Sequence, residues 1–229
     1  MKPERALVVL TTCCLVLAGC GVNKSIHIAD GETVDGGKVT VNGSIRIGAG
    51  CEIRGNCQTV NGKVTVGAGS RVGGLRTVNG SVKIADDVSV DDDVGTVNGS
   101  IRLAENVSID GDVETVNGSI VCDAGSTISD DVSAVNGSIH LARTEVGGSL
   151  TTVNGSVTLT DHSRVTGDVI IKGKNRRGAK KKVIEITIAN GSMVEGDIVV
   201  RDSKRQVTVI LSGGGQVKGE IHNAKVVEE

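Results

Sequence analysis

The stretch Thr40-Val-Asn-Gly-Ser44 decides the fold of this chain, because close copies of it return along the sequence at nearly constant spacing. The copies are 18 or 19 residues apart, and a degenerate one, Val22-Asn-Lys-Ser25, precedes the first by 19 residues. The asparagines of the seven full copies are Asn42, Asn61, Asn79, Asn98, Asn117, Asn136 and Asn154. Self-similarity at a fixed short period is the signature of a repeat architecture, so we expect a stack of similar units.

Apolar residues occupy the same places in each copy. In the first copy, Ile45 and Ile47 stand three and five places after the asparagine, and Ile53 stands eleven places after it. Another such position, Cys57 in this copy, comes just before the next motif. Apolar and polar residues alternate around these places over two or three residues, which favours strands over helices. Each copy is therefore predicted to form three short strands.

Stacked copies predict an all-β fold: a single β-solenoid with three short strands per coil of 18–19 residues and about ten coils. Equivalent residues then lie about 4.8 Å apart and pair in parallel. The sequence contains no Phe, Tyr or Trp, which suits a narrow core of small aliphatic residues. We expect right-handed winding. The alternative is left-handed, because Val66, Val72 and Val78 recur every six residues, as in the hexapeptide acyltransferases.

The Asn-Gly pair is predicted to mark a corner of each coil, because glycine adopts positive φ without strain and asparagine tolerates it better than most residues. The direction of these asparagines stays open. They face outward if Val41 and its equivalents face the core, and they form a buried ladder if Thr77 sets the alternation. If motif threonines such as Thr40 and Thr59 face solvent, they form a regular hydroxyl array suited to ice.

The first residues have the pattern of an export signal. Lys2 and Arg5 precede an apolar run over residues 6–18, which is too short to span a bilayer. The run ends in Leu17-Ala-Gly-Cys20, which closely resembles the lipobox of bacterial lipoproteins. The resemblance implies removal of residues 1–19, a covalent lipid on Cys20 and, because Gly21 follows, export to the outer membrane. Two or three acyl chains would anchor the chain stably.

The repeat changes after Asn154. Residues 20–171 are predicted to form the solenoid, residues 172–182 a basic loop insertion, and residues 183–229 the last coils and an end cap. The basic residues of the insertion are Lys172, Lys174, Arg176, Arg177, Lys180, Lys181 and Lys182. Their summed charge favours contact with an anionic surface such as lipid headgroups. The alternative is a solvated loop without a ligand.

No pattern in the sequence indicates catalysis or a metal site. Cys51 and Cys57 are close enough in sequence to form a disulfide, which an exported protein can keep, or they are reduced core residues. Cys122 takes the place of a core aliphatic residue. The aspartates within residues 86–93 attract Ca²⁺ or form a solvated corner. We therefore expect no enzyme, no bound metal and no cofactor besides the lipid on Cys20.

Two further resemblances concern the repeats. Val165-Thr-Gly-Asp-Val169 and Val217-Lys-Gly-Glu-Ile221 look like the repeats of bactofilins, which are bacterial polymer-forming proteins with a right-handed β-helix. The Val-Asn-Gly-Ser-Ile copies look like the adhesin-type β-helix repeats of exported bacterial proteins. Neither family offers catalytic residues, so both resemblances imply a structural or binding role.

The sequence thus predicts a lipoprotein of the bacterial cell envelope, attached to the outer membrane and facing the periplasm or the cell surface. Its expected role is that of a scaffold or self-associating β-helix. The alternative is an adhesin-like or envelope-binding module that uses the flat solenoid faces or the basic loop to contact an anionic envelope component. A formal net charge of −2 argues against a nucleic-acid binder.

Overall fold

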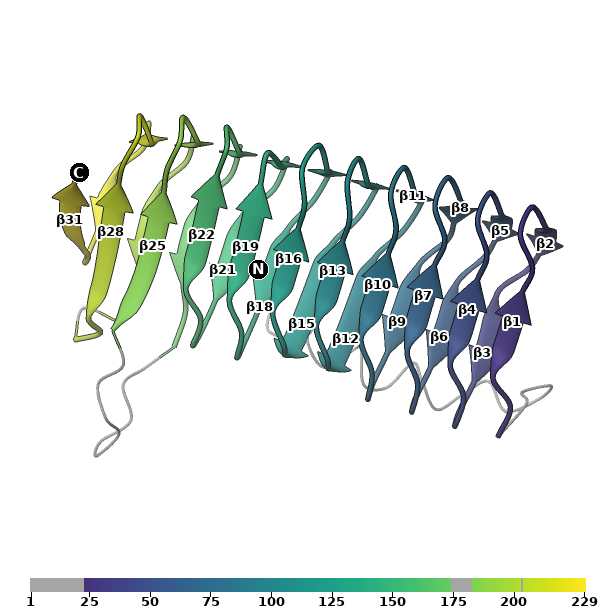
Figure 1. Cartoon of the computed structure of the whole chain (residues 1–229). Helices are drawn as coiled ribbons and strands as arrows, with labels where there is room; N and C mark the ends of the chain where they lie inside the picture. The colour runs from purple at the N-terminus through teal and green to yellow at the C-terminus, as the bar shows by residue number, and fades with distance from the viewer. Residues whose placement is uncertain (1–22, 174–182, 203) are drawn as a thin grey trace.

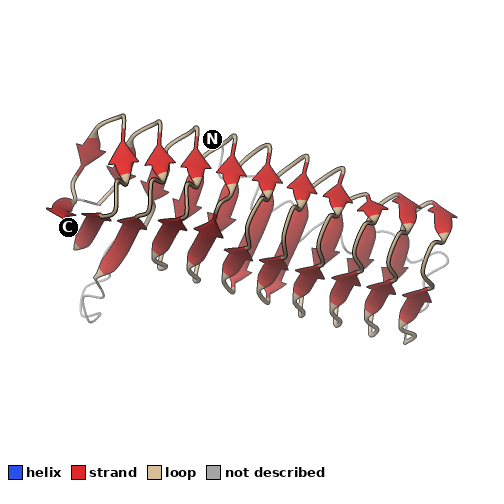
Figure 2. Ribbon diagram, turned by 45° about the horizontal axis from the view of Figure 1, so that its top comes forward, coloured by secondary structure: helices blue, strands red, loops and turns tan. Residues whose placement is uncertain are grey.

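The computed structural model describes residues 23–173, 183–202 and 204–229, and every regular element in these ranges is a β-strand. The strands form three parallel sheets along the sides of an elongated coil (Figures 1 and 2). Sheet 1 contains β1 (Ile26–Ile28), β4 (Ile45–Ile47), β7 (Val64–Val66), β10 (Val82–Ile84), β13 (Ile101–Leu103), β16 (Ile120–Cys122), β19 (Ile139–Ala142), β22 (Val157–Thr160), β25 (Ile184–Ile188), β28 (Val207–Leu211) and β31 (Lys225–Glu228).

Sheets 2 and 3 are built in the same way from the other strands of each coil. Sheet 2 contains β2 (Thr33–Asp35), β5 (Glu52–Arg54), β8 (Arg71–Val72), β11 (Ser89–Val90), β14 (Ser108–Ile109), β17 (Thr127–Ile128), β20 (Glu145–Val146), β23 (Arg164–Val165), β26 (Met193–Val194) and β29 (Gln216–Val217). Sheet 3 contains β3 (Lys38–Thr40), β6 (Cys57–Thr59), β9 (Leu75–Thr77), β12 (Val94–Asn98), β15 (Val113–Asn117), β18 (Val132–Ala134), β21 (Leu150–Thr152), β24 (Val169–Ile171), β27 (Ile198–Val200) and β30 (Ile221–His222).

The predicted β-solenoid is confirmed. Each strand pairs in parallel with its counterpart in the next coil, so that Ile101 lies beside Ile120 and Ile120 beside Ile139. Ten coils contribute a strand to all three sheets, and β31 adds one more strand to sheet 1. In Figure 1 the strands of sheet 1 run upward in front of sheet 3 while the chain advances from right to left. This arrangement is a right-handed helix, so the left-handed alternative is wrong.

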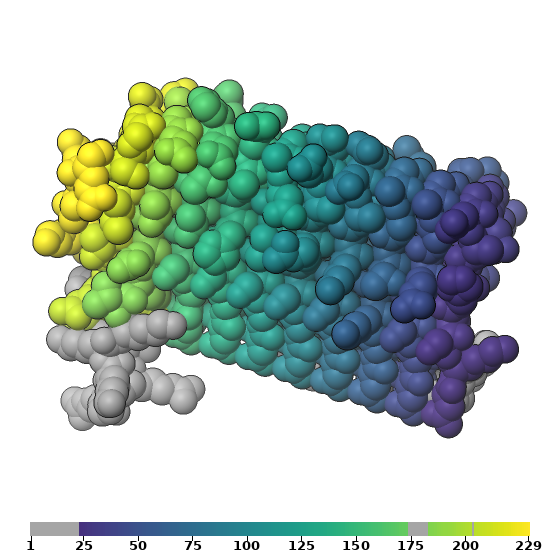
Figure 3. Space-filling view, in the orientation of Figure 1, coloured from purple at the N-terminus to yellow at the C-terminus, as the bar shows by residue number. Residues whose placement is uncertain are grey.

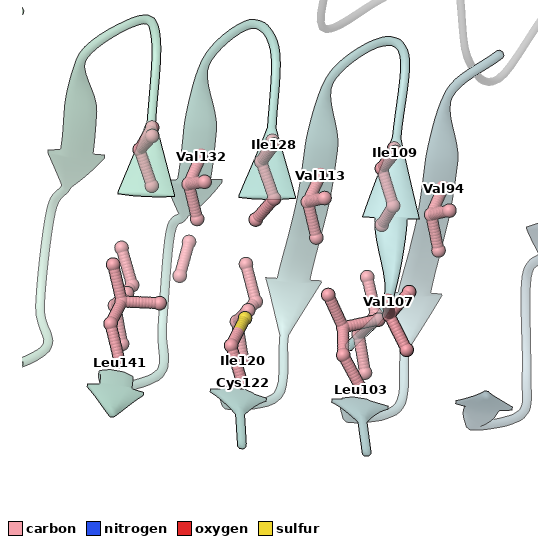
Figure 4. Close-up of a cluster of buried hydrophobic side chains, with 14 of the residues drawn as sticks. Val94, Leu103, Val107, Ile109, Val113, Ile120, Cys122, Ile128, Val132 and Leu141 are labelled. Atoms are coloured by element: carbon pink, nitrogen blue, oxygen red, sulfur yellow. The ribbon is translucent and has the colours of Figure 1, made fainter. Parts of the chain in front are cut away.

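The core is a narrow column of aliphatic side chains, with two from sheet 1 and one each from sheets 2 and 3 in most coils, such as Ile101, Leu103, Ile109 and Val113. Figure 4 shows Leu103, Cys122 and Leu141 of sheet 1 facing two rows of side chains above them: Val94, Val113 and Val132 of sheet 3, and Ile109 and Ile128 of sheet 2. Nearly all inward positions between the second and tenth coils are less than 5% exposed. Because the sheets are close together, one small aliphatic residue per position fills the space, and this explains a core without aromatic residues.

At the motif corner the side chains follow neither of the two arrangements expected from strict inward–outward alternation along a strand. Leu75 and Thr77 face the core, yet Val78 and Asn79 both lie on the outer surface. The buried threonines donate to the motif glycine carbonyl of the preceding coil, as Thr59 Oγ1 does to Gly43 O at 2.7 Å. This bond turns the chain, and two successive residues point outward. The motif asparagines are therefore outside, and an ice-binding array of these buried threonines is excluded.

The motif glycines are required by crowding and not by positive φ. Neither the motif asparagines nor the motif glycines adopt a positive φ, contrary to the expectation from the Asn-Gly pair. A Cβ placed on Gly99 would collide with the carbonyl oxygen of Gly80, and Gly118 stands against Gly99 in the same way. The backbones of successive coils come so close at this corner that no side chain fits between them.

The inward and outward positions of one strand should differ sharply in their sensitivity to truncation. Ile120 is fully buried, whereas its neighbour Val121 points out of sheet 1. We predict that Ile120→Ala lowers the free energy of unfolding by about 2–5 kcal/mol, because it leaves a cavity in the column. Val121→Ala should cost less than about 1 kcal/mol. Urea unfolding followed by circular dichroism measures both, and equal losses would contradict the assigned orientation.

Candidate interaction surface

A stripe of outward-facing, partly exposed valines runs along the outer face of sheet 3. Its members come directly before the motif asparagines: Val41, Val60, Val78, Val97, Val116, Val135 and Val153. None of them belongs to the core, and Val116 is 37% exposed. With coils about 4.8 Å apart, the valine stripe is about 29 Å long. Contiguous apolar surface of this kind marks an interaction site more often than a scattered apolar residue does. Figure 3 shows the regular stacking of the coils in space-filling form.

One side of the valine stripe is bordered by the asparagine ladder. From Asn42 to Asn154, each motif amide Nδ2 donates to Oδ1 of the asparagine in the preceding coil at 2.7–2.9 Å. The degenerate copy supplies the first acceptor, Asn23. An amide suits this column because it both donates and accepts without carrying charge. The ladder therefore stacks coil upon coil at the surface with no electrostatic repulsion.

Arg205 terminates the asparagine ladder at the C-terminal end. Its Nη2 donates to Oδ1 of Asn154 at 2.6 Å, which satisfies the last acceptor of the amide column. In the two following coils, Lys172 and Arg201 take the place of the valines, as their backbone bonds to Thr152 and Ile171 show. The apolar stripe thus ends at three cationic side chains.

Acidic side chains border the other side of sheet 3. Asp93, Asp112, Asp131, Asp168 and Asp197 each accept the backbone N–H of the corresponding residue in the next coil at 2.8–3.0 Å. Burial raises the pKa of Asp112, and the neighbouring aspartates act in the same direction, while the N–H of Asp131 opposes them. The carboxylates tolerate stacking because each receives a backbone hydrogen bond.

A groove of about 280 Å³ opens in the middle of this face, where Gly95 stands. Gly95 points outward from β12, between Arg76 of the preceding coil and Glu114 of the following one. A Cβ at this position would meet nothing closer than Glu114 O at 3.9 Å. The backbone therefore has room for a side chain at Gly95, and its absence leaves a hollow between two opposite charges.

Of the two charged side chains beside the hollow, only Arg76 forms an ion pair within the described part of the chain. Arg76 Nη2 forms an ion pair with Asp93 Oδ2 at 2.7 Å. Glu114 forms no ion pair with any other described residue. Burial raises the pKa of Glu114, as do Asp112 and Asp93, while the charge of Arg76 acts against this rise. Glu114 also interacts electrostatically with Lys172. The face therefore presents a partly desolvated carboxylate that forms no ion pair with another described residue.

Most of the site residues expected from the sequence lie outside the described ranges. These are Cys20 in the lipobox and, in the basic insertion, Lys174, Arg176, Arg177, Lys180, Lys181 and Lys182. Lys172 is described and lies half-buried at the end of the valine stripe. Burial lowers the pKa of Lys172, and the nearby charge of Arg201 lowers it further. Lipid attachment and anionic contact stay predictions.

The cysteines of the described ranges are buried free thiols. Cys51 and Cys57 do not form the disulfide that their spacing allows. Cys51 Sγ donates to Ala29 O at 3.0 Å, and burial raises the pKa of Cys57. Burial also raises the pKa of Cys122, as expected of a thiol within the core. A thiol held in its neutral form is a poor nucleophile.

The acidic run of residues 86–93 is divided among separate contacts. Asp91 pairs with Arg71 at 2.8 Å, and Asp92 accepts from Asn56 at 3.0 Å. Across the described ranges no three His, Cys, Asp or Glu side chains form a group that could hold a metal ion. The described part of the chain also contains no helix with the length and apolar character needed to cross a membrane.

Comparison of the chain with models of known families, with curated proteins and with solved structures gave no match. The sequence left the direction of the valines in the stripe open, because alternation counted from Thr77 turns Val78 outward whereas an inward-facing Val41 is equally compatible with the pattern. The signal was present, since every full copy of the motif has a valine before its asparagine.

Because the asparagine ladder needs a donor in every coil, a carboxylate within it should destabilise the solenoid. Asn98→Asp removes the Nδ2 that donates to Asn79 and places a charge against its Oδ1. We predict a loss of about 1–3 kcal/mol at neutral pH, which shrinks as acid protonates the new carboxyl. Chemical unfolding at several pH values measures it. The same amide-to-acid exchange at exposed Gln216 is the control, and equal effects of the two would contradict the ladder's contribution.

Proposed function

We propose that the chain is a structural protein: an exported, membrane-anchored lipoprotein whose β-solenoid associates with copies of itself as a scaffold. The observation that carries the proposal is the valine stripe on a flat and regular face. Large apolar strips on soluble proteins mark protein–protein contacts. The regular repeat also favours a partner with the same spacing, because one contact can then be repeated in every coil.

The architecture suits a mechanical role. Ten coils joined by continuous parallel pairing form a rod about 48 Å long. In such a rod each coil is held by both neighbours, so bending requires the loss of many hydrogen bonds together. The predicted lipid on Cys20 precedes Asn23, the first described residue, by three positions. An anchor at Cys20 would therefore hold the first coil close to the bilayer.

A second candidate function is binding of an anionic envelope component. It is favoured by the grouping of Lys172, Arg201 and Arg205 beside the predicted basic loop, where the charge of Arg201 helps to lower the pKa of Lys172. This cluster would attract phosphate groups of lipids or lipopolysaccharide. Binding to anionic vesicles that persists after neutralisation of all three residues would count against it.

The scaffold proposal predicts that the chain without its lipid self-associates in solution. A soluble form that begins at Gly21 should change from monomer to dimer or larger species as its concentration rises. Analytical ultracentrifugation over a wide concentration range gives the mass directly, with circular dichroism as a control for folding. A folded chain that stays monomeric at the highest attainable concentration would contradict the proposal.

A further inference from the structure

The charges on the outer face of sheet 3 are arranged symmetrically about Gly95. The outward residues of successive coils along this face include Gln58, Arg76, Gly95, Glu114 and Ser133. Arg76 lies one coil before Gly95, and Glu114 lies one coil after it. If a twofold axis along β12 relates two copies, Arg76 of one copy therefore lies opposite Glu114 of the other, and the uncharged residues lie opposite uncharged residues.

From this arrangement we infer that sheet 3 binds the same face of a second copy, with antiparallel solenoid axes and a twofold axis along β12 at Gly95. The inference rests on the proposed self-association and names the surface responsible for it. In such an isologous contact, Arg76 of each copy meets Glu114 of the other. Gln58 meets Ser133, and the charged side chains of the central column meet no like charge.

The same axis places the valine stripe of one copy along that of the other. Val97 lies on the axis, Val78 meets Val116, and Val60 meets Val135 in register. A twofold axis along the solenoid can lie on the valine stripe or on the central column, but not on both. On the valine stripe it leaves Arg76 and Glu114 without partners in the other copy, and on the central column it sets Arg76 against Arg76. Because only the axis along β12 aligns the stripes and also pairs opposite charges, the charge pattern selects the antiparallel arrangement.

The hollow at Gly95 gives the charged side chains room within such an interface. Gly95 of the two copies would face each other, and the groove of about 280 Å³ would become an enclosed space. The long side chains of Arg76 and Glu114 flank this space and can turn into it. Glu114, which pairs with no described cation in the single chain, would gain the guanidinium of the second copy. In the acidic column only Asp93 would face its own counterpart, at the edge of the groove where water and salt screen the repulsion, because Asp112 and Asp131 would lie opposite Gly74 and Asn56.

The size of the face indicates a dimer of moderate strength. Five residues along the strand and the seven coils that overlap correspond to about 16 Å by 34 Å, or roughly 540 Å² per copy. This is somewhat below the area of about 800 Å² per partner in a standard stable interface. Attachment of both copies to one membrane would raise their effective concentration and strengthen the contact.

The antiparallel arrangement also determines how anchored copies would lie. The first coil of one copy would rest beside the seventh coil of the other, so the two predicted lipid anchors would be on opposite sides of the axis. A dimer with both anchors in one bilayer would therefore lie along the membrane surface. Upright copies on one membrane could not form this contact.

Charge reversal at the two central positions tests the inference. Arg76→Glu places a second acid opposite Glu114 of the other copy, and Glu114→Arg places a second base opposite Arg76. Each single variant should self-associate at least about tenfold more weakly than the unmodified chain. A mixture of the two variants should form a heterodimer of restored strength, because one copy then carries two acids and the other two bases. Sedimentation equilibrium of the soluble chains measures all three.

The control is Arg46→Glu, which reverses an exposed charge on the outer face of sheet 1 and should leave association unchanged. The heterodimer shows that both variants are folded and competent to bind. If the unmodified chain associates but the reversals have no effect, or the mixture fails to associate, this assignment of the surface is wrong and the scaffold proposal stands. If the unmodified chain is monomeric throughout, both are overturned.

Discussion

The pairing of each coil with the next in strict register is the constraint on which the whole molecule depends. Every residue lies about 4.8 Å from its counterpart in the next coil. The side chains stacked at one position must therefore be able to pack against copies of the same residue type. Aliphatic residues meet this condition in the core. Amides meet it at the motif corner, where each asparagine donates to one neighbour and accepts from the other. Aspartates meet it only where each carboxylate receives a backbone N–H from the next coil.

Much of this architecture could be predicted from the spacing of one motif. The period of 18 or 19 residues indicated the register, and the alternating apolar residues indicated the strands and the inward positions. The direction of the asparagines could not be predicted, because the hydrogen bond of a buried threonine such as Thr59 breaks the alternation at the corner. The reason for the motif glycines was also hidden, since sequence does not distinguish a glycine needed for positive φ from one needed for close backbone approach.

The candidate surface was harder to predict than the fold. A valine before every motif asparagine is compatible with a core position as well as with an outward one, so the sequence alone does not place these valines on the surface. Gly95 is a similar case, because it breaks no pattern in the sequence and yet opens a hollow on the surface. The contact between Arg205 and Asn154 joins residues 51 positions apart. It follows from no repeat, and only the three-dimensional arrangement brings it out.

Register also connects the fold with the proposed function. A surface that repeats in every coil offers the same contact many times, and only its irregular positions can specify one alignment. On sheet 3 these positions are Arg76, Gly95 and Glu114, which interrupt an otherwise uncharged central column. The valines supply apolar area, and the charges select the direction of the partner. The lipid on Cys20 and the location in the envelope rest on the lipobox resemblance, and they would place this association at a membrane.

The most direct test of this account is the distance between identical positions in two associated copies. Spin labels on Val97→Cys, at the proposed axis, should lie close together in pulsed dipolar spectroscopy. Val41 is three coils away, so labels on Val41→Cys should be displaced along the solenoid by about 29 Å. The native cysteines of the described chain are buried and stay unlabelled. A short distance at position 97 with a clearly longer one at position 41 is the predicted result. Equal distances at both positions would contradict the antiparallel contact through sheet 3.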